Sequence, residues 1–148
     1  NTRNRGKIMW VLASSRPDLI EVDLKRPGRI DVKIPLFPTL SAQEGFALVQ
    51  ALCKRRGIVL QDEDFAELEG MIPELLTPGA AETISVKAFR LKKTQDLDDR
   101  AALKACLEEY RPPVALDILR FQMQIAAEEA TDASLVPDAV GHLLSKER

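Results

Sequence analysis

Histidine, cysteine and tryptophan are scarce in this sequence of 148 residues, which has one His, two Cys and one Trp. Cys53 and Cys106 lie far apart in the sequence and form no CxxC pair, and with only His142 beside them a zinc site is disfavoured. We expect two buried thiols in a reducing compartment instead. His142 has no recognisable partner for nucleophilic catalysis, and we expect it to have a surface or packing role.

Long apolar runs and an excess of charge of one sign are also missing. No stretch approaches the roughly 20 apolar residues that cross a bilayer, and the basic first residues lack the pattern of a cleavable leader. The formal net charge is −2, which provides no basic stripe of the kind that nucleic-acid-binding surfaces carry. The sequence therefore predicts a cytoplasmic protein with neither membrane nor nucleic-acid partners.

The stretch from Lys7 to Pro38 predicts two strands joined by a polar connection. Residues 8–13 are almost continuously apolar, which is typical of a strand buried on both faces of a parallel sheet. Residues 30–34 alternate apolar and charged side chains, which predicts a half-covered strand nearer a sheet edge. Ser14 and Ser15 follow the first strand at the edge where open α/β sheets bind ligands, although a plain turn is the alternative interpretation.

The connection between the two predicted strands contains a short helix and a tight bend. Asp18 is placed to cap a helical turn over residues 19–24. Residues 25–29, Lys-Arg-Pro-Gly-Arg, combine a rigid Pro with a permissive Gly. This composition predicts a tight bend that presents the guanidinium groups of Arg26 and Arg29.

These segments, in this order, resemble the carboxyl-terminal part of the nucleotide-binding core of the AAA+ ATPases (ATPases associated with diverse cellular activities). Members carry an apolar strand, a Thr-Asn-Arg-Pro-Asp-like sensor 1 segment, a short helix and an Arg-Pro-Gly-Arg-Phe-Asp-like arginine-finger segment. A strand that ends in Pro then follows. In this chain residues 14–18 read Ser-Ser-Arg-Pro-Asp, residues 26–31 read Arg-Pro-Gly-Arg-Ile-Asp, and residues 34–38 read Ile-Pro-Leu-Phe-Pro.

The resemblance implies roles for three side chains. Arg26 and Arg29 would reach the nucleotide bound to the neighbouring subunit of a ring, and Ser15 would replace the sensor 1 Asn that orients the attacking water. Arginine suits a γ-phosphate because it is always charged and offers a planar fork of donors. The alternative is that both arginines are solvated surface residues, and that the Ser15 hydroxyl is too short to reach the water.

Behind Pro38 the pattern predicts helices only. A capping box at residues 41–44 and a closing Gly57 bound the first of them. Thr77 before Pro78 is a favoured helix start. The further helices are expected over residues 62–71, 78–93, 98–110, 114–129 and 136–144.

The first four helices resemble the AAA+ lid, the small bundle that closes over the adenine and ribose of the nucleotide. Residues 77–80, Thr-Pro-Gly-Ala, stand where many members have Ser/Thr-Gly-Ala-Asp at a helix start. Gly79 and Ala80 are thereby implied to let the backbone approach the nucleotide closely. Two positions depart from the family pattern, because Leu52 replaces a His and Ala81 replaces the Asp.

The expected fold is mainly α, a helical lid bundle preceded by the last two strands of an α/β AAA+ core. The expected division is core fragment 1–38, lid 39–115 and helical extension 116–148. ATP and Mg²⁺ are the implied cofactors, and identical or related AAA+ subunits in a ring, expected to be a hexamer, are the implied partners.

The sequence contains no GxxxxGK[ST] phosphate loop and no strand ending in paired acidic residues. We therefore expect a piece of a longer ATPase that is inactive alone, with the magnesium ligands elsewhere in the intact protein. That protein would remodel a macromolecule that the sequence does not identify. The alternative is a non-catalytic helical interaction or adaptor module derived from an AAA+ core, and a DNA-associated member is disfavoured by the lack of a basic face.

Overall fold

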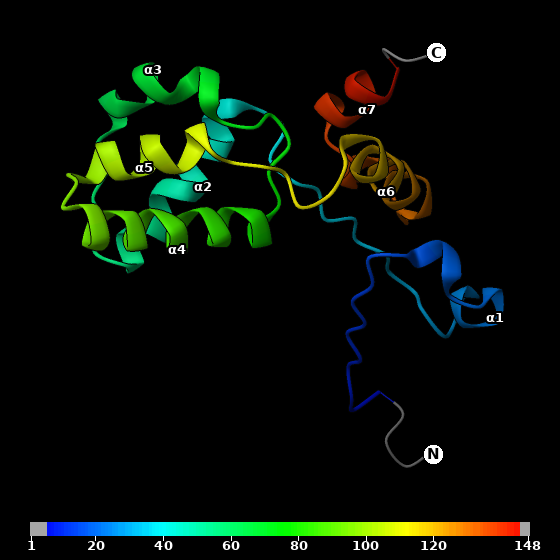
Figure 1. Cartoon of the computed structure of the whole chain (residues 1–148). Helices are drawn as coiled ribbons and strands as arrows, with labels where there is room; N and C mark the ends of the chain where they lie inside the picture. The colour runs from blue at the N-terminus through cyan, green and yellow to red at the C-terminus, as the bar shows by residue number, and fades with distance from the viewer. Residues whose placement is uncertain (1–5, 146–148) are drawn as a thin grey trace.

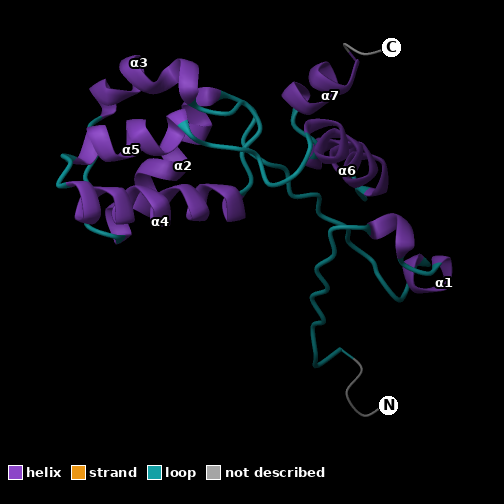
Figure 2. Cartoon of the chain, viewed as in Figure 1, coloured by secondary structure: helices purple, strands orange, loops and turns teal. Residues whose placement is uncertain are grey.

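The computed structural model describes residues 6–145, and every regular element within that range is a helix (Figures 1 and 2). The elements in chain order are η2 (Pro17–Leu19), α1 (Val22–Lys25), α2 (Ala42–Arg55), η3 (Asp62–Asp64), α3 (Phe65–Leu68), η4 (Glu69–Met71), α4 (Pro78–Gln95), α5 (Asp99–Glu108), α6 (Leu116–Glu129), η5 (Ala133–Leu135) and α7 (Asp138–Ser145). The predicted mainly α fold is confirmed. Within the same range, no helix has the length and apolar character needed to cross a bilayer.

Helices α2 to α5 form a bundle around one hydrophobic core (Figure 1). Helix α4 packs against both α2 and α5, while the short α3 and its flanking turns cover the other side. The core side chains are exposed by 1% or less at Val49, Cys53, Ile58, Leu68, Leu76, Ile84 and Leu103. Burial of this apolar surface is the main source of stability for the bundle.

The predicted ends of the first bundle helix are confirmed. The Ser41 hydroxyl accepts a hydrogen bond from the Glu44 amide at 3.2 Å, and the Glu44 carboxylate accepts one from the Leu40 amide at 2.7 Å. Gly57 follows the helix with φ +80°, a conformation that costs little only for glycine. Local hydrogen bonding therefore fixes α2 at both ends.

The starts of α4 and α5 are confirmed in the same way. The Thr77 hydroxyl accepts from the Ala80 amide at 3.2 Å, and the Asp98 carboxylate accepts from the Ala101 amide at 2.7 Å. The helix predicted over 62–71 is instead split into η3, α3 and η4.

The described structure differs from the prediction in the stretch before the bundle. Residues 8–13 and 30–34 form no strand, and the helical turn predicted over 19–24 is divided between η2 and α1. A strand obtains its backbone hydrogen bonds from neighbouring strands, and no second strand is present in residues 6–145. The apolar run is consequently exposed, with Met9 at 88% and Trp10 at 82%.

Helices α6 and α7 lie outside the bundle and pack on each other (Figure 1), and α6 also packs on η2. Met123 of α6 is 2% exposed and Val140 of α7 is 0% exposed. Neither side chain belongs to the core of the bundle. The C-terminal helices therefore have a small packing centre of their own, beside the segment that carries the predicted arginines.

Candidate functional site

Residues 26–29, which we call the arginine bend, form the turn that the sequence predicted. The Arg29 amide donates to the Arg26 carbonyl at 3.1 Å. Gly28 has φ +87°, and its amide donates to the Asp31 carboxylate at 2.7 Å. Because residues other than glycine rarely adopt this φ, Gly28 determines where the chain turns and how Arg26 and Arg29 project from the turn.

Both arginines of the bend contact one residue, Asp23 of α1. The Arg26 guanidinium lies 3.2 Å from the Asp23 carboxylate, and the Arg29 guanidinium donates to the Asp23 carbonyl at 3.0 Å. The Arg26 and Asp23 side chains are 68% and 62% exposed. An ion pair this exposed contributes at most about 1 kcal/mol. The two guanidinium groups are therefore gathered in one place but weakly held, so a stronger anionic acceptor could displace Asp23.

Ser15 lies on an exposed turn before η2. Its neighbour Ser14 accepts a hydrogen bond from the Arg16 amide at 3.1 Å, and the Arg16 guanidinium donates to both oxygens of Asp18 at 2.9 and 2.6 Å. The hydrogen bond from Arg16 lowers the pKa of the Asp18 carboxyl below its usual range. Ser14 and Arg16 thus have local structural roles. Both serines are exposed, but the Ser15 hydroxyl makes no hydrogen bond with another described residue.

Gly79 and Ala80 lie in the first turn of α4 and face different surroundings. A Cβ added to Gly79 would meet nothing within 4 Å, so the backbone there is open to a ligand. The Ala80 side chain is 5% exposed and belongs to the bundle core, while its amide is bound by Thr77. Ala81 is 0% exposed, which explains the departure from Asp, because a carboxylate at this position would be buried.

The predicted site residues fall into two groups that the described structure does not bring together. Ser15, Arg26 and Arg29 lie on the segment around η2 and α1, and Gly79 and Ala80 lie at the start of α4. In Figure 1 the bundle and α1 stand clearly apart. Each group can therefore contribute to ligand binding only separately in this structure.

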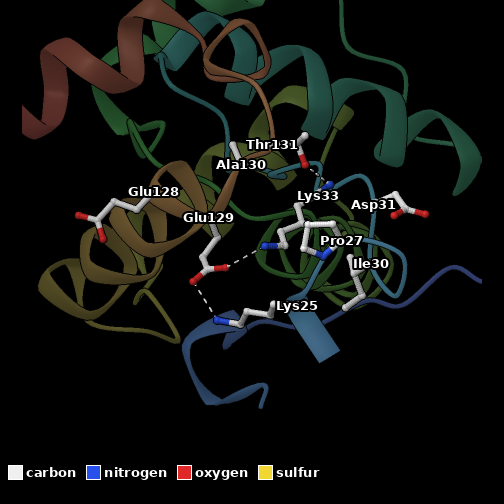
Figure 3. A pocket seen from close by; sticks show the side chains of 9 residues that line it. All are labelled: Lys25, Pro27, Ile30, Asp31, Lys33, Glu128, Glu129, Ala130 and Thr131. Atoms are coloured by element: carbon white, nitrogen blue, oxygen red, sulfur yellow. Dashed lines mark hydrogen bonds and ion pairs between the residues drawn. The ribbon is translucent and has the colours of Figure 1, made fainter. Parts of the chain in front are cut away.

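The segments on both sides of the arginine bend are bound by the end of α6, a contact that the sequence analysis missed (Figure 3). Lys25 Nζ lies 2.8 Å from Glu129 Oε1, and Lys33 Nζ lies 3.7 Å from Glu129 Oε2. The Lys33 amide donates to Thr131 Oγ1 at 2.6 Å, and the Thr131 amide donates to the Lys33 carbonyl at 3.1 Å. These groups, together with Pro27 of the bend, line a hollow of about 350 Å³.

The two cysteines are buried and unpaired, as predicted. Burial raises the pKa of the Cys53 thiol to about 11 and also raises the pKa of Cys106. Among residues 6–145, no three His, Cys, Asp or Glu side chains gather closely enough to hold a metal ion. The described residues do offer exposed arginine guanidinium groups and exposed backbone, and both kinds of group can bind anions.

Comparisons with protein-family models, with curated proteins and with solved structures give no match for this chain.

Proposed function

We propose that this chain is the sensor 1, arginine-finger and lid portion of an AAA+ ATPase, whose intact form hydrolyses ATP in a ring and couples hydrolysis to the remodelling of a macromolecule. The arginine bend is the observation that carries the proposal. It presents two exposed guanidinium groups that converge on the single weakly held residue Asp23, and it follows the sensor-like turn of Ser15 at the spacing of that family.

In the proposed reaction the arginines act on the nucleotide of the neighbouring subunit. Arg26 and Arg29 exchange Asp23 for the phosphate oxygens, where negative charge spreads in the transition state of phosphoryl transfer. The exchange is favourable because a phosphate offers more charge and a better fit to the planar guanidinium fork than a solvated carboxylate does. Ser15 is assigned to the attacking water of its own subunit.

The residues fit a bound ATP at the start of α4 as well. Gly79 offers an open backbone surface, and the first turn of this helix has no acidic side chain to repel an anion. The assignment here is restricted to Gly79, because the Ala80 side chain is buried and its amide already donates to Thr77. Mg²⁺ would neutralise phosphate charge, and its ligands would come from parts of the intact protein outside this sequence.

The proposal also places residues 8–13 and 30–34 as strands in the sheet of the intact core. Their backbones belong to no helix and their apolar side chains are mostly exposed, which suits pairing with further strands. The quickest check is the coding sequence upstream of Asn1. A phosphate loop after one apolar strand and an acidic pair after another would support the proposal, and an upstream region lacking both would favour the non-catalytic adaptor.

The decisive experiment substitutes Arg26→Ala in the intact subunit and measures ATP turnover and nucleotide affinity. We expect turnover to fall about 10³-fold or more while nucleotide affinity is retained, because an arginine finger acts mainly on the transition state. Arg100→Ala is the matched control, because this arginine of α5 is 53% exposed and pairs with Glu67 at 3.2 Å. Unchanged turnover in Arg26→Ala would remove the arginine-finger assignment and favour the adaptor.

A further inference from the structure

We propose that the end of α6 positions the arginine bend for catalysis, with Glu129 and Thr131 as positioning residues. The inference rests on the proposed function, since it assumes that the bend acts on a nucleotide. It assigns a role to the C-terminal helical extension, which the family resemblance leaves without one.

Glu129 joins the two flanks of the bend through one carboxylate. Lys25 precedes the bend and Lys33 follows it, and each lysine faces a different oxygen of Glu129, at 2.8 and 3.7 Å (Figure 3). The side chains of Lys25, Glu129 and Lys33 are 16%, 29% and 31% exposed. Partial shielding from water makes such a charge cluster stronger than a fully exposed ion pair. The cluster therefore ties both flanks to one point at the end of α6.

Thr131 adds a second attachment, made to the backbone. Its hydroxyl accepts from the Lys33 amide at 2.6 Å, and its own amide donates to the Lys33 carbonyl at 3.1 Å. A pair of reciprocal bonds to one residue fixes the position of that backbone, which an ion pair between flexible side chains does not. The C-terminal flank of the bend is thereby set in register with the end of α6.

The predicted sensor turn is attached to the same helix. The Arg16 guanidinium carbon lies 5.7 Å from the centre of the Phe121 ring, and α6 also packs on η2. Cation–π contacts of this kind contribute about 0.5 to 1 kcal/mol at exposed sites. One helix thus contacts both segments to which the resemblance assigns a catalytic role.

The contacts with α6 do not involve the two arginines that are assigned to catalysis. Arg26 and Arg29 are exposed and contact Asp23, whereas the contacts to α6 come from Lys25 and Lys33. A device that blocked the bend would engage its guanidinium groups. The arrangement therefore favours positioning over inhibition, because it restricts the backbone of the bend and keeps both arginines facing outwards.

The first test uses the 148-residue chain without nucleotide and measures trypsin cleavage at Arg29 and Lys33 by mass spectrometry. Cleavage requires the segment to leave its docked position, so we expect Glu129→Gln to be cut about fivefold faster than the native chain. Glu128→Gln is the matched control, because Glu128 is exposed and accepts from Gln124 at 2.9 Å. Thr131→Val should also be cut faster than the native chain, whereas Thr131→Ser, which keeps the hydroxyl, should be cut at the native rate.

The second test measures steady-state ATP hydrolysis by Glu129→Gln in the intact ring. We expect kcat to fall about fivefold with an unchanged KM for ATP, because the bend acts on chemistry and not on binding. Equal trypsin cleavage of Glu129→Gln and Glu128→Gln would overturn the attachment, whatever the turnover. Faster cleavage with unchanged kcat would overturn the positioning role, if Arg26→Ala abolishes turnover in the same ring. Unchanged turnover in Arg26→Ala would instead remove the proposed function, and with it the role of the bend.

Discussion

The helical bundle of residues 39–110 and the segment before it contain similar apolar side chains, but the bundle buries them and the preceding segment exposes them. In the bundle, Leu68, Leu76 and Leu103 are all 0% exposed. In the preceding segment, Leu12 is 68% exposed and Leu36 is 89% exposed. Apolar content alone therefore does not decide burial in this chain.

The difference follows from how each kind of backbone satisfies its hydrogen bonds. A helix bonds within itself, so α2, α4 and α5 need from one another only an apolar face. An extended segment needs a neighbouring strand for its backbone as well as a surface for its side chains. The bundle can thus complete its own core, whereas residues 8–13 have no neighbouring strand among residues 6–145.

The largest effect that we expect from this comparison comes from a matched pair of leucines. Leu103→Ala should lower the free energy of unfolding of the bundle by about 2 to 5 kcal/mol, because it leaves a cavity in a packed core. Leu36→Ala removes the same atoms from an exposed side chain and should change the free energy by less than about 0.5 kcal/mol. Urea denaturation followed by circular dichroism at 222 nm measures both.

Equal losses in the two leucine variants would break the comparison. Such a result would show that residues 30–38 are packed in solution and unfold together with the bundle. A loss confined to Leu103→Ala would support a bundle that folds around its own core.

The next largest expected effect is a loss of folding stability at high pH, caused by a buried thiol. Burial raises the pKa of Cys53 from its ordinary value of 9.0 to about 11. Between pH 9 and 11 the unfolded chain therefore loses a thiol proton that the folded chain retains, so the bundle should lose stability as the pH rises. A shift of this size corresponds to about 2 to 3 kcal/mol at pH 11. Urea denaturation at pH 8 and at pH 11 measures the loss.

Cys53→Ala is the control, because it removes the thiol and keeps every other group that titrates in this range. The variant should be less stable at pH 8 through lost packing, and its stability should depend less on pH above 9. The same pH dependence in both proteins would show that the thiol is not buried as the structure has it.

The sequence predicted best those elements whose determinants are close together along the chain. Ser41, Thr77 and Asp98 marked the starts of α2, α4 and α5, because a cap and the amide that it binds lie within one turn. The two predicted strands do not form within residues 6–145, since strand pairing depends on segments that the pattern does not reveal. The arginine bend was found from its Pro and Gly, whereas the contact between Lys25 and Glu129 was missed because the two side chains are 104 residues apart.

The smallest expected effect concerns an N-terminal cap, which α2, α4 and α5 have and α6 lacks. Ala115 precedes α6 with an extended backbone and no side-chain cap, so Ala115→Asp should stabilise this helix by about 1 kcal/mol. Slower hydrogen exchange in α6, with unchanged exchange in α4 and α5, would show that the two regions open independently. Asp98→Ala removes the cap of α5, so it should speed hydrogen exchange in α5 and leave exchange in α6 unchanged. An equal slowing of hydrogen exchange in α4, α5 and α6 in Ala115→Asp would instead mean that α6 and the bundle open as one unit. The attachment of the arginine bend to Glu129 would then be lost only when the bundle core opens.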